Sequence, residues 1–178
     1  TYPYYCTEQI TSRFMPAVFV HRLLANTKID KSGPVETKQL EEIINDGIQR
    51  LNNQQHPDGG WGWWTENESD PFLTAYAYLA LFEAKNDGFT VADQTLKRAQ
   101  DCLEEKLAKD EQKTPLDTQA YIIYVLKGAK VNLSSYAANL FERRFELSLE
   151  SRAYLVMAMK DMPGMGERAR RLHDELVG

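Results

Sequence analysis

The stretch YYCTEQITSRF spans residues 4–14 and predicts the start of a helix. Within it, Cys6 and Gln9 stand three positions apart, so on a helical turn the thiol sulfur and the side-chain amide carbon are neighbours on one face. The N–H groups at a helix N-terminus favour the thiolate form of a cysteine. Attack of that thiolate on the Gln9 carbonyl, with loss of ammonia, gives an internal thioester, which is an acyl group ready for a nucleophile. We therefore take Cys6 and Gln9 as the candidate site.

The helix that follows is predicted over residues 10–24. Ile10, Phe14 and Val18 recur at helical spacing and define one apolar face, with His21 as a candidate extension of it. The cysteine also has a plain structural explanation, because a free cysteine is often buried as a small hydrophobic residue. Spacing alone therefore leaves both interpretations of Cys6 open.

The longer string YPYYCTEQITSR, residues 2–13, resembles the thioester region of the α2-macroglobulin and complement family. Its bacterial members carry Tyr-Pro-Tyr-Gly-Cys-x-Glu-Gln before a similar helix start. The resemblance implies that Cys6 and Gln9 form the thioester. The supporting motif residues are Glu8, Tyr4 and Tyr5. Tyr5 departs from the family pattern, since it replaces a glycine, a residue usually kept where φ is positive or the backbone approaches closely.

Composition describes one globular domain over residues 1–178, with 43% hydrophobic and 26% charged residues. A net charge of -5 argues against a nucleic-acid partner, because phosphate binding requires a basic surface. No apolar run reaches the length of a membrane span. The chain opens on Thr1-Tyr2-Pro3 without a signal peptide, so we expect a piece of a larger protein, with the parent's other domains as partners.

A second informative stretch is PDGGWGWW, residues 57–64. Its first half predicts a tight turn, and the three tryptophans behind it are too apolar to lie wholly in water. Similar strings occur at the ends of helical hairpins in α/α toroid proteins, where the ring plugs the loop, so packing is the favoured role. The alternative is a dry collar that protects the thioester from water. The candidate shielding aromatics are Tyr2, Trp61, Trp63 and Trp64.

The rest of the chain predicts helices and no series of strands. Further helices are expected over residues 35–51, 72–85, 91–107 and 116–128, with three more starting near 133, 148 and 166. In the helix predicted over residues 91–107, Cys102 should be buried on a face with Ala99, Leu103 and Leu107. DPFLTAY, residues 70–76, is similar to the family's continuation. We predict an all-α fold, an α/α toroid of helical hairpins, as a truncated ring of about four hairpins.

Metal and cofactor chemistry finds little support, and we expect neither. The histidines His21, His56 and His173 are scattered, without the spacing of a zinc site. No Gly-x-Ser-x-Gly elbow supports a serine hydrolase. Complement members of the family carry a downstream histidine that directs the thioester to hydroxyls, and the corresponding segment 106–114 has none. The resemblance therefore implies amine targets, chiefly lysine side chains of proteases.

Three hypotheses follow. The first is the thioester domain of a bacterial α2-macroglobulin-like, broad-spectrum protease inhibitor, which is not an enzyme and which the resemblance places in the periplasm, cell envelope or outside the cell. The second is a binding toroid that has lost the thioester, motivated by Tyr5. The third is an isoprenoid cyclase or prenyltransferase-like toroid, suggested by the string at 58–62 and ranked last because no Asp-rich motif or zinc ligand set is present.

Overall fold

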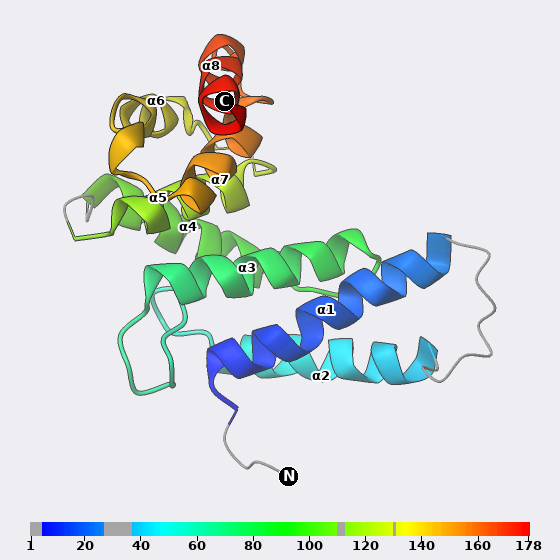
Figure 1. The fold of residues 1–178 in the computed structure, drawn as a ribbon. Helices are drawn as coiled ribbons and strands as arrows, with labels where there is room; N and C mark the ends of the chain where they lie inside the picture. The colour runs from blue at the N-terminus through cyan, green and yellow to red at the C-terminus, as the bar shows by residue number, and fades with distance from the viewer. Residues whose placement is uncertain (1–4, 27–36, 110–112, 130) are drawn as a thin grey trace. The chain divides into compact units, whose positions relative to one another are not determined.

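The regular structure of the described chain is helical (Figure 1). The structure is a computed structural model and describes residues 5–26, 37–109, 113–129 and 131–178. Within these ranges there is no strand, which confirms the all-α prediction. The arrangement of hairpins as a truncated toroid stays a prediction. Tyr2 and Tyr4 lie outside the described residues.

The helices follow the predicted order. Their bounds are α1 (Thr7–Asn26), α2 (Thr37–Gln54), α3 (Pro71–Asn86), α4 (Asp93–Lys109), α5 (Leu116–Leu126), α6 (Ser134–Glu142), α7 (Leu149–Met159) and α8 (Gly166–Val177), with a 3-10 turn, η1, at Arg144–Glu146. Helix α3 differs from its predicted bounds by one residue at each end, whereas α5 stops before the predicted Gly128. None of the described helices combines the length and apolar character that a bilayer crossing requires.

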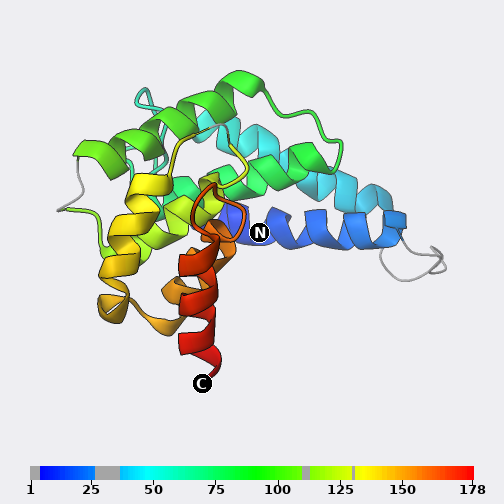
Figure 2. The ribbon, with the colours of Figure 1, turned by 90° about the horizontal axis from the view of Figure 1, so that it is seen from above.

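The chain divides into two compact units, Thr1–Cys102 and Leu103–Gly178. In the first unit, α1 lies against both α2 and α3 (Figures 1 and 2). In the second, α7 contacts α5, α6 and α8. The candidate site belongs to the first unit. A single domain over residues 1–178 stays a prediction.

Close packing joins α1 to α2. Ile10, Phe14 and Val18 are buried on α1, as their spacing predicted. Gly47 of α2 lies directly against Phe14, and a Cβ at Gly47 would stand 2.6 Å from the Phe14 Cβ. Such a distance is well inside van der Waals contact, so this glycine allows α2 to approach α1 as closely as it does.

A proline interrupts the hydrogen bonds of α1. Pro16 lies inside the helix and has no N–H to donate to the carbonyl of Ser12, four residues earlier. The helix nevertheless continues to Asn26. The first and last turns of α1 are thus separated by a position at which one backbone bond is missing.

Helix α3 begins and ends with the predicted signals. Asp70 is its N-cap and accepts the Leu73 N–H at 2.8 Å, and Pro71 occupies the first helical position. Beyond its end, Gly88 has a φ of +93°, a value that favours glycine. The prediction for α4 is also confirmed, because Ala99, Cys102, Leu103 and Leu107 are all buried.

Candidate functional site

The first turn of α1 brings Cys6 and Gln9 together. Helix α1 begins at Thr7, three residues before the predicted start, so Cys6 stands at the N-cap position. The Cys6 backbone N–H donates to the Gln9 Oε1 at 3.4 Å, and the Cys6 carbonyl accepts the Ile10 N–H at 3.0 Å. Cys6 is 6% exposed, whereas Gln9 is exposed. A buried thiol residue and a solvent-facing amide therefore share one turn.

The geometry of this turn resembles a capping box. In that motif the side chain at the third helical position accepts a hydrogen bond from the backbone N–H of the N-cap residue, as Gln9 does for Cys6. The amide carbonyl of Gln9 is thereby directed back toward Cys6. Sequence spacing predicted the proximity of the two residues, but not the hydrogen bond that orients the amide.

The backbone on both sides of Cys6 is bound to other parts of the first unit. Before it, the Tyr5 carbonyl accepts a hydrogen bond from Gln54 Nε2 of α2 at 3.2 Å. After it, the Thr7 N–H donates to the Trp63 carbonyl at 3.2 Å. The loop between α2 and α3 thus satisfies one of the backbone donors that a helix N-terminus leaves without an intrahelical partner.

That loop is built on the predicted turn. The Gly59 N–H donates to the His56 carbonyl at 3.0 Å, with Pro57 at the second position of the turn. Gly59 has a φ of +89°, which an L side chain adopts only at a cost. The Gly60 N–H donates to Asp58 Oδ1 at 3.0 Å and completes the turn.

A side-chain bridge closes the loop, and sequence analysis missed it. Ser69 Oγ donates to Asp58 Oδ1 at 2.8 Å and lies 3.0 Å from His56 Nδ1. Because the hydroxyl proton of Ser69 is directed to Asp58, His56 is not placed as its base. The bridge is therefore structural, and no sequence signal other than the presence of a turn pointed to it.

The three tryptophans of this loop have different surroundings. Trp61 is 0% exposed and its Nε1 donates to the Leu51 carbonyl at 2.8 Å, so the predicted plug is confirmed for this residue. Trp63 and Trp64 are 52% and 44% exposed. These two side chains are thus partly removed from water, as expected, but they do not reach the core: the chain turns after Trp63, and the Trp64 N–H donates to Asn67 Oδ1 at 3.1 Å. Their role as shielding aromatics stays a prediction.

Tyr5, at the position of the family's glycine, has a defined set of contacts. The guanidinium carbon of Arg50 in α2 lies 4.4 Å from its ring centroid. Arg13 Nη1 of α1 donates to the Tyr5 hydroxyl at 3.3 Å. Arg50 is itself held by both carboxylate oxygens of Asp46, at 2.9 and 2.8 Å. The hydrogen bond that Arg50 donates to Asp46 outweighs the opposing effect of burial and raises the pKa of Arg50.

Glu8 lies on another side of the same turn. Ser12 Oγ donates to Glu8 Oε1 at 2.6 Å and stands 3.1 Å from the Tyr76 hydroxyl of α3. This chain of hydrogen bonds joins the first turn of α1 to α3. Glu8 therefore supports the local structure of the turn.

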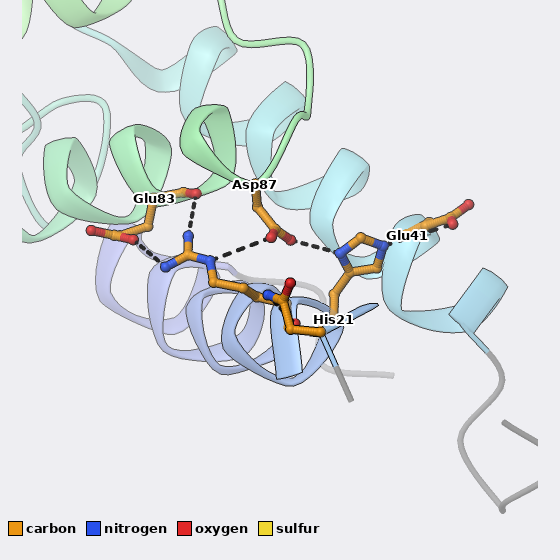
Figure 3. Close-up of polar contacts among 6 residues, drawn as sticks. His21, Glu41, Glu83 and Asp87 are labelled. Atoms are coloured by element: carbon orange, nitrogen blue, oxygen red, sulfur yellow. Dashed lines mark hydrogen bonds and ion pairs between the residues drawn. The ribbon is translucent and has the colours of Figure 1, made fainter. Parts of the chain in front are cut away.

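At the other end of α1, charged side chains meet (Figure 3). His21 Nδ1 lies 2.6 Å from Asp87 Oδ2, and its Nε2 lies 3.9 Å from Glu41 Oε1. Arg22 binds Glu83 at 2.8 Å and Asp87 at 3.3 Å. His21 is thus part of a polar cluster, and its candidate place on the apolar face is wrong, because its partners come from α2 and the end of α3.

The charges of this cluster support one another. Burial lowers the pKa of Arg22, but hydrogen bonds and charges from Glu83 and Asp87 outweigh burial, so the pKa is raised. Among the described residues, no group of three or more His, Cys, Asp or Glu side chains has the geometry of a metal site. The cluster is therefore an ion-pair network.

Comparisons with known proteins agree on the family. The chain is 41% identical to an α2-macroglobulin of Thermotoga maritima over 97 residues, covering 54% of this chain and 6% of that protein. It is 28% identical to an α2-macroglobulin of Rickettsia conorii over 195 aligned positions, covering 99% of this chain and 10% of that protein. The chain thus spans about a tenth or less of the length of these relatives.

Solved structures show the same fold. A Salmonella α2-macroglobulin reacted with methylamine matches with a TM-score of 0.82 at 25% identity, over 99% of this chain and 12% of that one. The native Escherichia coli α2-macroglobulin, spanning domain MG7 to the C-terminus, matches with a TM-score of 0.83 at 23% identity, over 99% of this chain and 29% of that one. A model of the A-macroglobulin TED domain matches residues 1–162. The sequence matches and the helical fold therefore agree, and the chain belongs to the A-macroglobulin TED domain family.

Proposed function

We propose that Cys6 and Gln9 form an internal thioester and that the chain is the thioester domain of a bacterial α2-macroglobulin-like protease inhibitor. One observation carries the proposal. In a chain of this family, the Gln9 amide oxygen accepts the Cys6 backbone N–H at 3.4 Å, so the amide and the thiol residue are held on one turn. Holding two reacting groups in a fixed relation removes much of the entropy cost of their reaction.

Closure of the thioester needs only these two side chains. The Cys6 sulfur attacks the Gln9 amide carbon, a C–S bond forms, the C–N bond breaks, and the proton given up by the thiol goes to the nitrogen, which leaves as ammonia. The product is an acyl group whose leaving group is a thiolate.

The captured target is an amine. A neutral lysine amine attacks the acyl carbon, an amide bond forms, and Cys6 leaves as a thiolate that takes up the proton released by the amine. The Salmonella relative described as reacted with methylamine supports amine reactivity in a protein of the same fold. Each chain reacts once and is not regenerated, so the domain is a trap and not an enzyme.

The working protein contains more than this chain. In the proposed mechanism a protease cleaves a bait region in another domain, and the resulting movement brings its lysines to the thioester. Gln9 is exposed in this chain, and Trp63 and Trp64 of the loop that binds the Thr7 N–H are about half exposed, so we expect other domains of the parent protein to help protect the thioester from water. We place the protein in the periplasm, the cell envelope or outside the cell, where it would meet foreign proteases.

Intact mass tests the thioester. We expect freshly purified, unreduced chain to be lighter than its sequence mass by one ammonia, and methylamine treatment to add the mass of one methylamine to that species. Cys6→Ala should have the full mass of its sequence. Cys102→Ala is the matched control, because Cys102 is also buried, and it should keep the deficit. A full-mass chain whose Cys6 reacts with thiol reagents would exclude the thioester.

The second candidate is a binding module without a thioester. It is favoured by the capping-box geometry, because the hydrogen bond from Cys6 to Gln9 stabilises the start of α1 without any reaction. The same mass measurement separates the two functions. Membership of the TED family gives no support to the third hypothesis, an isoprenoid cyclase-like toroid.

A further inference from the structure

Tyr5 is the residue of the candidate site that departs from the family pattern, and the structure gives it contacts that a glycine cannot make. We propose that Tyr5 is a positioning residue for the thioester: its ring, held between Arg50 of α2 and Arg13 of α1, fixes the Cys6 backbone relative to Gln9 and so favours closure. This inference rests on the proposed function.

The ring of Tyr5 is held from two helices. Arg50 stacks on it at 4.4 Å, and Arg13 donates to its hydroxyl at 3.3 Å. A guanidinium over an aromatic face is attracted by the ring's negative face. Because Arg50 is bound to Asp46 through both carboxylate oxygens, its guanidinium is fixed in place before it meets the ring.

These contacts act on the residue that carries the thiol. Tyr5 and Cys6 share a peptide bond, and the carbonyl of that peptide accepts Gln54 Nε2 at 3.2 Å. The same peptide's N–H, on Cys6, donates to the Gln9 amide. Restricting the rotation of this one peptide plane therefore fixes both the direction of the Cys6 N–H and the Gln9 amide that it binds.

The Tyr5 ring also lies toward the face of α1 that carries Gln9. Arg13 is four positions after Gln9, so the two residues are neighbours on one face of α1. A hydroxyl that reaches Arg13 directs the Tyr5 ring along that face. The side chain thus connects the residue before Cys6 to the face that presents the Gln9 amide.

A glycine at position 5 would leave the peptide before Cys6 without these side-chain contacts. Glycine has more backbone freedom than any other residue and loses more of it on ordering. In this chain the ring contacts restrict the peptide instead. The Tyr5 side chain takes no part in bond making: the C–S bond forms between Cys6 and Gln9, the C–N bond breaks, and ammonia leaves without proton exchange with the phenol.

The test compares three variants by the ratio of closed to open chains in freshly purified protein, measured by intact mass. We expect Tyr5→Gly to lower this ratio about threefold to tenfold, the loss that corresponds to one cation–π contact and its restraint. Arg50→Met should also lower the ratio. Its effect should be smaller in a Tyr5→Gly background than in wild type, because the two substitutions remove the same contact. Tyr5→Phe loses the hydroxyl that Arg13 binds but keeps the ring beside Arg50 and Arg13, so the ratio should fall by no more than about twofold and less than in Tyr5→Gly.

A matched control excludes a general effect of losing a stacked cation. Lys127 lies 4.4 Å from the ring centroid of Tyr124 in the second unit, the same distance as in the Arg50 stack. Lys127→Met should leave the ratio unchanged. Melting temperature, measured on every variant, separates positioning from stability, because a purely structural role of Tyr5 would change the melting temperature and leave the ratio alone.

The possible results are distinct. A wild-type deficit that falls in Tyr5→Gly and Arg50→Met, and persists in Tyr5→Phe, supports the inference. If wild type shows the ammonia mass deficit and Tyr5→Gly shows the same ratio of closed to open chains, the inference is overturned and the proposed thioester stands. A wild-type chain of full mass overturns both.

Discussion

At its last turns α1 is joined to α3 by charged side chains, whereas at its first turn it is joined to its neighbours mainly through backbone groups. His21 and Arg22 bind Asp87 and Glu83 at distances of 2.6 to 3.3 Å. The first turn is bound through the Tyr5 carbonyl and the Thr7 N–H. Both ends are fixed, but by different chemical groups.

The difference bears on the thioester proposed for the first turn. Where side chains form the attachment, as at His21 and Arg22, they are occupied and half-buried. Where the backbone forms it, the Gln9 side chain can stay within its own turn: the residue is exposed, and its amide oxygen accepts the Cys6 N–H. A helix end that carries a reactive pair benefits from being held by its backbone.

The largest expected effect comes from removing the packing of the loop that binds the first turn of α1. Trp61→Ala deletes a fully buried indole and leaves the Leu51 carbonyl without its donor. We expect a loss of about 3–5 kcal/mol in the free energy of unfolding, measured in urea. Amide hydrogen exchange should accelerate at residues 7–10 more than at residues 21–26, because the loop that binds the Thr7 N–H is loosened.

The control for this prediction is the neighbouring indole. Trp63→Ala removes a side chain that is 52% exposed and keeps the Trp63 carbonyl, so stability should change by less than about 1 kcal/mol. Equal losses in the two variants would contradict the division between one packed and two exposed tryptophans.

The second expected effect concerns the other end of α1. Asp87→Ala removes the carboxylate, 8% exposed, that binds both His21 and Arg22. We expect a loss of about 2–3 kcal/mol, because the partly buried Arg22 loses one of its carboxylate partners and His21 loses its hydrogen-bond partner. Hydrogen exchange should now accelerate at residues 21–26 and not at residues 7–10.

Its control is a weaker partner of the same histidine. Glu41 is half exposed and 3.9 Å from His21, so Glu41→Ala should change stability by less than about 1 kcal/mol. If Asp87→Ala accelerated exchange equally at both ends of α1, the proposed separation of the two attachments would be refuted.

A third, smaller effect tests the loop between α2 and α3 at its C-terminal end, where Asp70 caps α3. Asp70 caps α3 with its side chain and donates its own N–H to the Trp61 carbonyl at 2.9 Å. Asp70→Ala should cost about 1 kcal/mol in urea unfolding, the usual value of an N-cap. Ser148→Ala removes the N-cap of α7 and is the matched control: a similar loss is expected, without faster exchange at the first turn of α1.

The smallest expected effect is a pH dependence outside α1. A hydrogen bond from Arg144 holds the pKa of Glu175 below its usual value. A carboxyl whose folded pKa is lowered contributes stability that is complete above the unfolded pKa and is lost as pH falls through the folded one. Stability should therefore fall on acidification below the ordinary glutamate pKa, and Glu175→Gln should weaken that fall. An unchanged acid slope in Glu175→Gln would show that other groups, such as the α1 cluster, set it.

Local patterns predicted most of the helices. The spacing of Ile10, Phe14 and Val18 gave α1, and Asp70 with Pro71 gave the start of α3, because these signals depend on neighbours in sequence. The start of α1 was predicted three residues late. It depends on the Trp63 carbonyl, which the chain brings to Thr7 from the loop between α2 and α3.

Contacts between distant segments were beyond sequence analysis. The i, i+3 spacing predicted that Cys6 and Gln9 would be neighbours, but nothing local indicated that Arg50 would stack on Tyr5 or that Asp87 would bind His21. The sequence likewise does not distinguish Trp61, Trp63 and Trp64 by their expected burial. Which of them is buried depends on where the turn closes, and only Trp61 reaches the core.

Pro16 has a consequence for the cooperativity of α1. Helical order propagates from turn to turn through successive backbone hydrogen bonds, and the bond that residue 16 would donate is missing because Pro16 has no N–H. Fraying that begins at either terminus therefore has a natural stopping point midway. The turn that carries Cys6 and Gln9 can therefore lose its helical order while the half of α1 beyond Pro16 keeps its own.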